Sequence, residues 1–243
     1  TGSSRLPDKV LMKLENKTVL EHVFNRVKKS KLISDIVVAT TLKDEDLRIV
    51  KICAENKIKI YCGAENDVLD RFYQIAKILN PDNIVRITAD CPVIDPDVID
   101  LVIEQHIQNN ADYTCNGLDK VTFPDGQDVE VIKFDVLKIA CLESTLKSEK
   151  EHVTPFIRYK PDRFKLLNVE NTQDLSDQRW TLDDTEDFNL LKIIFSKLYQ
   201  VNNFFGMDQI FKFIEENPDL KKINNHIIRN EGYQKSLIDD LKD

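Results

Sequence analysis

DIVVATTLKDEDLRIVKICAENKIKIY, residues 35–61, indicates the fold class of this chain. It begins with a short apolar run, DIVVAT (35–40), which is typical of a strand covered on both faces. DEDLRIVKICAEN (44–56) predicts a helix with acidic residues in its first turn, where the helix dipole favours them. IKIY (58–61) predicts a second strand. A strand, a helix and a strand in this order predict a parallel βαβ unit.

The same alternation continues on both sides of this unit. The periodicity predicts helices at 18–30, 67–79 and 95–109, and strands at 82–88 and 111–115. We therefore expect an α/β fold of the Rossmann-like type, with a mostly parallel sheet flanked by helices. In open sheets of this kind, ligands bind beyond the carboxyl ends of the strands, so the residues that follow each strand are the ones to inspect.

The pattern loosens after residue 116. A turn-rich loop is followed by a predicted strand at 128–134, helices at 135–147 and 150–160, and strands at 164–170 and 178–183. Pro155 should start or bend the second of these helices. Helices are expected again at 185–199, at 207–217 and over the last residues. We expect a single domain, 1–243, with an inserted sub-structure at 116–180 and a helical C-terminal extension at 200–243.

Composition excludes several classes of partner and site. The 243 residues carry a net charge of −8, which argues against nucleic-acid or anionic-membrane partners. The five cysteines form no C-x-x-C pair, so neither a zinc site nor a disulfide framework is indicated. With no signal peptide and no apolar stretch near the ~18 residues of a membrane span, we expect a cytoplasmic protein.

The opening stretch TGSSRLPDK (1–9) has the residue types of a phosphate-binding loop. Gly2, Ser3 and Ser4 let backbone N–H groups approach an anion, and Arg5 and Lys9 add charge-assisted contacts. The glycine spacings of the P-loop and of the dinucleotide fingerprint are both absent. An exposed terminus with two solvated charges explains this stretch equally well.

Two aspartates follow predicted strands. Asp90, in VRITADCPVIDP (85–96), comes at the carboxyl end of one strand, and Asp183, in RWTLDDTEDF (179–188), comes at the end of another. A turn aspartate is the alternative for Asp90, and helix capping explains most of the acidic cluster after Asp183. Two carboxylates facing one crevice opposite a basic loop are nevertheless what a magnesium–triphosphate complex needs.

Eight motifs together give the sequence a specific resemblance. In chain order they are GSSRLPDKVL, VVATT, GAENDVLDRFYQIA, VRITADCPVIDP, DGQDVEV, EHVTPFI, RWTLDDTEDF and NPDLKKINNHIIRNEGYQKSL. This order resembles the spore-coat polysaccharide type of cytidylyltransferase, which is similar to CMP-N-acetylneuraminate and CMP-Kdo synthetases. The resemblance covers essentially the whole chain. It implies a fold of the nucleotide-diphospho-sugar transferase type.

The resemblance also implies roles for individual residues. Arg5, Lys9, Asp90 and Asp183 would be catalytic, and Asp90 and Asp183 would bind Mg²⁺. The residues that would contact the nucleotide are Gly2, Ser3, Arg5, Lys9, Ala39, Thr40, Asp67, Arg71 and Asp90. Those on the sugar side, a looser assignment, would be Gln127, Asp128, Glu130, Glu151 and His152. A structural histidine is the alternative for His152.

The chain departs from the family pattern at two positions. Asp8 stands where glycine is common, which puts a negative charge near the phosphates, and Asp184-Thr185 replaces a more usual Thr-Pro pair. In the family the opening motif follows a first strand, so the resemblance implies that a strand before Thr1 is missing here. Related enzymes dimerise through a comparable insertion, which makes a homodimer the expected assembly.

The expected reaction is transfer of CMP from CTP to a sugar hydroxyl, with release of pyrophosphate, for surface or coat polysaccharide biosynthesis. Three alternatives remain at this point. The same fold could use another nucleoside triphosphate or a sugar phosphate, the chain could bind nucleotide without catalysis, or it could act as a fused partner of a larger sugar-pathway enzyme.

Overall fold

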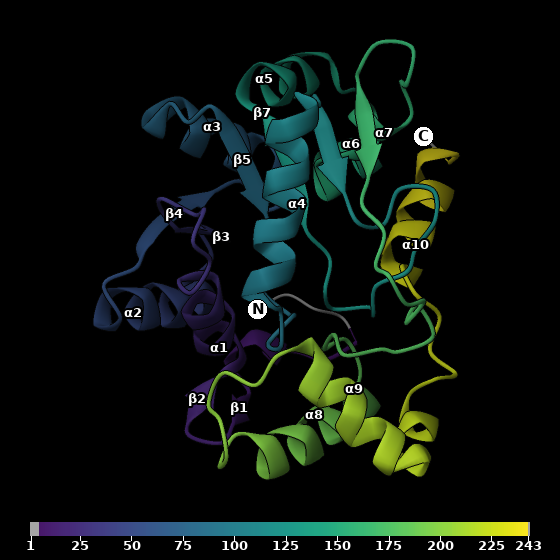
Figure 1. Cartoon of the computed structure of the whole chain (residues 1–243). Helices are drawn as coiled ribbons and strands as arrows, with labels where there is room; N and C mark the ends of the chain where they lie inside the picture. Colours follow the sequence, from purple (N-terminus) through teal and green to yellow (C-terminus); the bar gives the residue numbers. More distant parts are fainter. Residues whose placement is uncertain (1–4, 243) are drawn as a thin grey trace.

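The computed structural model describes residues 5–242, and Figure 1 shows their arrangement. The strands are β1 (Lys13–Leu14), β2 (Lys17–Thr18), β3 (Val37–Thr41), β4 (Lys59–Gly63), β5 (Asn83–Arg86), β6 (Tyr113–Cys115), β7 (Glu130–Lys133) and β8 (Leu166–Asn168). The α-helices are α1 (Val19–Val27), α2 (Leu47–Glu55), α3 (Val68–Leu79), α4 (Pro96–Asn109), α5 (Phe134–Glu143), α6 (Lys147–His152), α7 (Pro155–Arg158), α8 (Thr185–Leu198), α9 (Met207–Glu216) and α10 (Glu231–Asp240). Short 3₁₀ turns occur at Lys9–Leu11, Asp44–Asp46 and Pro218–Ile223.

The α/β fold expected from the sequence is confirmed, with parallel and mixed sheets flanked by helices. Strands β3 and β4 pair in parallel, and the predicted helix between them is α2 preceded by a 3₁₀ turn. A four-stranded sheet has the order β5-β7-β6-β8, in which β6 and β8 are parallel and β7 is antiparallel to both of its neighbours. Among the described residues β3 pairs only with β4 and β5 only with β7, and the expected strand before Thr1 stays a prediction.

Local signals fix the ends of the helices that flank these strands. Asp67 caps α3 by accepting a hydrogen bond from the Asp70 N–H, and Asn80 ends the helix in the left-handed conformation. Asp95 caps α4 in the same way, with Pro96 in the first turn where its missing N–H costs little. These helices therefore match the predicted ranges closely.

The strand predicted at 178–183 is wrong. Only an isolated bridge joins Asp125 and Arg179, and none of the named strands includes residues 178–183. The reason is that this extended segment pairs with two different loops: the Trp180 N–H donates to Asp125 O, and the Leu182 N–H donates to Asp90 O. Gly126, at φ 100°, also turns the partner chain away directly after Asp125.

Residues 116–180 share the sheet that carries β5 and β6. They contribute β7 and β8, so the region expected as an insertion is built into the four-stranded sheet. The single helix predicted at 150–160 divides at Val153, which has φ 72°, and Pro155 starts α7 as expected. In Figure 1 α10, the yellow C-terminal helix, lies beside α6.

The packing around α8 and α9 orients the segment that carries Asp183. Trp180 and Leu182, both fully buried, pack in one cluster with Leu191, Ile194 and other apolar residues of α8 and α9. Because this close packing fixes the Leu182 side chain, the position of the adjacent Asp183 at the edge of the core is fixed as well. None of the helices in residues 5–242 has the length and apolar character needed to cross a membrane.

Candidate active site

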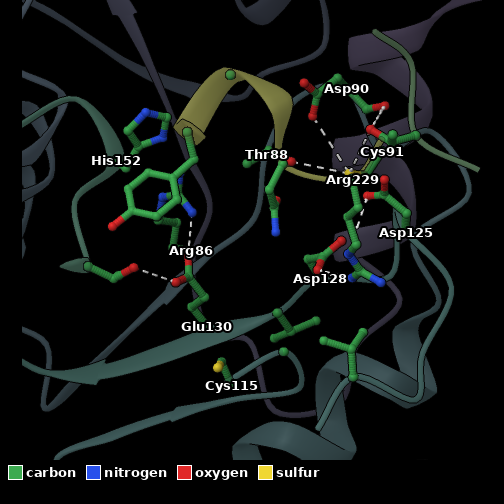
Figure 2. Close-up of a pocket in the computed structure, with 18 of the residues that line it drawn as sticks. Arg86, Thr88, Asp90, Cys91, Cys115, Asp125, Asp128, Glu130, His152 and Arg229 are labelled. Carbon is green, nitrogen blue, oxygen red and sulfur yellow. Dashed lines mark hydrogen bonds and ion pairs between the residues drawn. The ribbon is translucent and has the colours of Figure 1, made fainter. Parts of the chain in front are cut away.

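A cavity of about 280 Å³ opens where strands β5 and β6 end. Its floor includes Arg86, the last residue of β5, and Cys115, the last residue of β6. Figure 2 shows Asp90, Asp125, Asp128 and Arg229 on one side of this cavity. The opposite side carries Arg86, Glu130 and His152. This position at the carboxyl ends of strands is where α/β sheets bind ligands.

Lys9 joins the two predicted metal-binding aspartates at the edge of the cavity. Its Nζ lies 2.6 Å from Asp90 Oδ2 and 2.7 Å from Asp183 Oδ1. Burial alone would lower the pKa of Lys9, but the two carboxylates outweigh it and the net shift is upward. Burial likewise would raise the pKa of Asp90, but Lys9 lowers it, so this group is a lysine ammonium between two carboxylates.

Arg5 lies beside this group and is surrounded by carboxylates. Its Nη1 donates to Asp184 Oδ2 and to Glu231 Oε2, each at 2.8 Å, and its Nη2 lies 3.3 Å from Asp183 Oδ2. The Arg5 side chain is 25% exposed. The structure thus brings Arg5, Lys9, Asp90 and Asp183 together from distant parts of the sequence. Gly2 and Ser3, predicted to bind phosphate, lie outside the described residues.

A buried ion network holds Asp183 in place. Arg179 donates to both carboxylate oxygens of Asp187 at 2.9 Å, and its Nη2 lies 3.1 Å from Asp183 Oδ2. Asp187 is fully buried, accepts the backbone N–H of Asp183, and receives a further hydrogen bond from Asn224 Nδ2. Arg179 and Asn224 were not singled out by sequence reasoning, and the arginine beside the tryptophan in RWTLDD was the available signal.

The oxygen donors fit a hard divalent cation that arrives with a nucleotide. Within residues 5–242, no three His, Cys, Asp or Glu side chains gather in a way that could hold a metal ion. Magnesium, however, is usually bound by one or two carboxylates together with substrate phosphates and waters. Asp90 and Asp183, held close enough for one ammonium to touch both, match that pattern.

The predicted nucleotide-contacting residues on β3 and α3 lie outside this cavity. Ala39 and Thr40 are in β3, and the Thr40 hydroxyl donates to Asp46 Oδ2 at 2.8 Å. Arg71 is 9% exposed and its buried Nε lacks a hydrogen-bond partner among the described residues. Its side chain runs across Gly63, where an added Cβ would stand 2.8 Å from Arg71 Cγ. Asp67 is the cap of α3.

The five predicted sugar-side residues divide into two groups. Asp128, Glu130 and His152 line the cavity, whereas Gln127 and Glu151 are not among its lining residues. The Gln127 side chain is fully buried and bonds the backbone of Val93 and Asp95, so it supports the loop after Asp90.

The remaining sugar-side residues are held by other side chains. Glu130 accepts hydrogen bonds from Tyr113, Thr154 and Arg86, so both of its carboxylate oxygens are already bonded. His152 Nε2 lies 2.9 Å from Ser236 Oγ, and burial lowers its pKa. The Ser236 hydroxyl is also bonded to Glu151. The ring of His152 therefore contacts α10 through Ser236.

Arg229 is the main cavity residue that sequence reasoning missed. Its Nη2 donates to Asp128 Oδ1 at 2.5 Å and its Nη1 to Phe123 O at 3.1 Å. Burial and the nearby Asp128 raise the pKa of Asp125 to about 6, although Arg229 and Arg179 oppose this shift. Arg229 belongs to the motif NHIIRNEGY (225–233), which is the sequence signal for its place in the site.

With this geometry established, the comparisons with known proteins identify the family. A family profile described as Cytidylyltransferase matches residues 1–226. The chain belongs to the cytidylyltransferase family. Family membership makes it a nucleotidyltransferase enzyme. An uncharacterized protein of Methanocaldococcus jannaschii is 38% identical over 238 residues, covering 96% of this chain and 94% of that protein.

Further members of the family and its structural neighbours agree. The spore coat polysaccharide biosynthesis protein SpsF of Bacillus subtilis is 28% identical, over 90% of this chain and 92% of its own length. A cytidylyltransferase structure from Leptospira borgpetersenii has a TM-score of 0.86 at 31% identity, covering 94% of this chain and 95% of that chain. A CMP:2-keto-3-deoxy-manno-octonic acid synthetase structure has a TM-score of 0.60 at 16% identity, covering 81% of this chain and 95% of its own, and shows a shared fold.

Proposed function

We propose that this cytidylyltransferase transfers CMP from CTP to a hydroxyl group of a sugar and releases pyrophosphate. The sugar oxygen attacks the α-phosphorus, the bond from that phosphorus to the bridging oxygen of the β-phosphate breaks, and the hydroxyl proton is lost. The product, a CMP-sugar, would supply the synthesis of a surface or coat polysaccharide. The relative from Bacillus subtilis, by its name, belongs to such a pathway.

The observation that carries this proposal is the Lys9 ammonium between Asp90 and Asp183 at the edge of the cavity. Lys9 and Arg5 are the cations available for the β- and γ-phosphates and for the departing pyrophosphate. Asp90 and Asp183 would hold Mg²⁺, which supplies charge neutralisation at the triphosphate when bound. Positioning and electrostatics are the protein's main contributions in phosphoryl-transfer chemistry of this kind.

The rest of the cavity fits the acceptor sugar. Asp128 and Arg229 form one polar wall and the ring of His152 faces it from the other side. Arg158 lines the same space, donates to Gly117 O at 2.7 Å, and has no ion pair within residues 5–242. The other three arginines that line the cavity, Arg5, Arg86 and Arg229, are ion-paired. Arg158 is therefore the guanidinium available to bind an anionic group. We therefore propose an acceptor that carries a carboxylate or a phosphate.

Ala39, Thr40, Asp67 and Arg71 would border the cytosine and ribose, on the β3 and α3 side of the molecule. The Arg71 Nε, buried and without a hydrogen-bond partner among the described residues, is the feature that supports this placement. The phosphates of a nucleotide bound there would reach Lys9, Asp90 and Asp183. The cavity would then remain open for the sugar.

The test is a pyrophosphate-release screen of the full-length protein. Each of the four nucleoside triphosphates is combined with acidic sugars, amino sugars, neutral sugars and sugar phosphates, with Mg²⁺ or with EDTA. We expect release with CTP and an anionic sugar, and none with EDTA. Release with another triphosphate would assign a different nucleotide to the same site. No release in any combination would contradict the proposal.

Assembly is part of the same proposal. We propose a homodimer formed through residues 116–180 or through the helices that follow residue 200. Sedimentation-equilibrium measurement of the mass in solution tests it, and a monomer mass at micromolar concentration would contradict it.

A further inference from the structure

The C-terminal segment Arg229–Tyr233 forms one wall of the cavity, and α10 carries it. All five residues of this segment line the cavity. Two hydroxyl contacts join α10 to the body of the protein: Ser236 Oγ lies 2.9 Å from Nε2 of His152 in α6, and Tyr233 OH lies 3.1 Å from the OH of Tyr159, directly after α7. In Figure 1 α10 accordingly lies against α6. The segment is therefore held to the body of the protein by its side chains.

Glu231 connects this wall to the residue proposed to bind the triphosphate. Its Oε2 accepts a hydrogen bond from Arg5 Nη1 at 2.8 Å. Asp184 and Asp183 also lie within ion-pair distance of the same guanidinium. One arginine thus contacts three carboxylates. A triphosphate that approaches Arg5 adds further negative charge, and like charges at such distances repel.

Of the three carboxylates, Glu231 is the one that can leave. Asp183 is fixed by Lys9 and Arg179, and Asp184 stands at the start of α8, with its N–H donating to Asp187. The Glu231 side chain is 41% exposed, against 23% and 24% for the two aspartates. Its other oxygen, Oε1, lies 3.2 Å from Lys235 Nζ, so it keeps a cationic partner after it leaves Arg5.

We propose that Glu231 occupies the place of the triphosphate on Arg5 and that nucleotide binding displaces it, which loosens the C-terminal wall of the acceptor cavity. This inference rests on the proposed role of Arg5 in holding the triphosphate. It makes Glu231 a positioning residue that couples the two substrate sites. CTP then binds first and the acceptor enters afterwards, because the wall is released only when the phosphates have taken Arg5.

The first test measures the affinity for CTP with Mg²⁺ by calorimetry. Glu231→Gln removes the competing charge, so we expect CTP to bind about two- to fivefold more tightly than to the natural protein. Glu215→Gln, at an exposed glutamate of α9, is the matched control and should leave the affinity unchanged. In the Arg5→Gln background the Glu231→Gln effect should vanish, because the two residues act as one pair.

The second test measures hydrogen–deuterium exchange of the backbone over residues 229–240. Saturating CTP with Mg²⁺ should raise exchange there in the natural protein, and Glu231→Gln should show raised exchange without nucleotide. Unchanged exchange together with unchanged affinity in Glu231→Gln would overturn the inference while leaving the proposed function intact. Absence of any CTP binding by the natural protein would instead overturn the proposed function.

Discussion

The ammonium of Lys9 lies 2.6 Å from a carboxylate oxygen of Asp90, although the two residues are far apart in the sequence. The same nitrogen lies 2.7 Å from Asp183, so one side chain holds together the two carboxylates proposed to bind Mg²⁺. Under the proposed function this ammonium would turn to the phosphates when Mg²⁺ and the nucleotide bind. Lys9 would then have two roles: it pairs with the two aspartates in the free protein, and it would neutralise the triphosphate in the complex.

Removing the Lys9 ammonium should separate these two roles. Lys9→Met should lower the rate of pyrophosphate release at least about 100-fold, because a charge-stabilising contact is lost. It should also tighten the binding of Mn²⁺ in the absence of nucleotide, since the competing ammonium no longer occupies the space between Asp90 and Asp183. Kinetics and electron paramagnetic resonance titration of Mn²⁺ measure the two effects.

The control for this pair of measurements is Lys13→Met, at an exposed lysine of β1, which should change neither quantity. Weaker Mn²⁺ binding by Lys9→Met would contradict the account, because it would mean that the lysine does not compete with the metal.

Asp8 adopts a left-handed backbone conformation, with φ 59°, and its carboxylate binds the Arg48 guanidinium through two hydrogen bonds of 2.9 and 2.6 Å. Glycine adopts this conformation without strain, and the Arg48 guanidinium pairs with the charge of the aspartate. Asp8→Gly should therefore retain the Tm, whereas Asp8→Ala should lower it by about 2–4 °C through backbone strain. Calorimetric melting of both variants provides the comparison, and equal Tm values would argue against strain at this residue.

Arg179 is buried and pairs with Asp125, Asp183 and Asp187. Arg179→Met leaves the fully buried Asp187 without its cation, so we expect a loss of about 3–5 kcal/mol in the free energy of unfolding. Arg163→Met removes an exposed pair with Glu143 and should cost several times less. Urea unfolding measures both variants. Similar losses for the two would show that the Arg179 network does not stabilise the fold.

Two buried histidines should make stability depend on pH. Burial lowers the pKa of both His22 and His106 from 6.5 to about 4. Between these values the unfolded chain binds more protons than the folded chain, so stability falls as the pH drops from 6.5 to 4. Each histidine contributes up to about 1.4 kcal/mol per pH unit. Below about pH 6, Asp125 offsets the loss of stability caused by one of the histidines. Its raised pKa lets the folded protein bind a proton that the unfolded chain does not yet bind.

Urea unfolding at several pH values checks this dependence. Between pH 6.5 and 4, His106→Asn should reduce the slope of the free energy of unfolding against pH. The reduction should be the contribution of one proton relative to the natural protein. His226→Asn, at an exposed histidine, should leave the slope unchanged. A His106→Asn slope equal to that of the natural protein would contradict the expectation for this residue.

Much of the fold could be predicted because its local signals are strong. Helices α3 and α4 have side-chain caps at their first turns and left-handed asparagines at their ends, so their ranges were read almost to the residue. The segment 178–183 failed because alternating apolar residues predict an extended chain but not its partners. Here those partners are single backbone groups of two loops, brought together only by the tertiary fold. Local sequence patterns also do not predict that β7 runs antiparallel to β5 and β6.

The site residues also divide into those that local sequence signals identify and those whose place depends on tertiary contacts. Lys9, Asp90 and Asp183 were selected from their positions after predicted strands and in the basic loop, and the structure brings them together. Gln127 was placed on the sugar side by resemblance, yet its amide bonds Val93 and Asp95 inside the protein. Arg229 went unassigned because its partners, Asp128 and the Phe123 carbonyl, are more than a hundred residues away in the chain. Contacts of that kind follow only from the folded structure.

Asp90 and Asp183 are the residues proposed to bind the Mg²⁺ used in transfer of CMP from CTP. A single-turnover measurement with CTP labelled at the α-phosphate, an anionic acceptor sugar and Mg²⁺ tests this role most directly. We expect a labelled CMP-sugar from the natural protein and a rate at least about 100-fold lower in both Asp90→Asn and Asp183→Asn. The control Asp219→Asn, at an exposed aspartate, should transfer at the natural rate. Transfer at the natural rate by Asp90→Asn and Asp183→Asn would contradict the account.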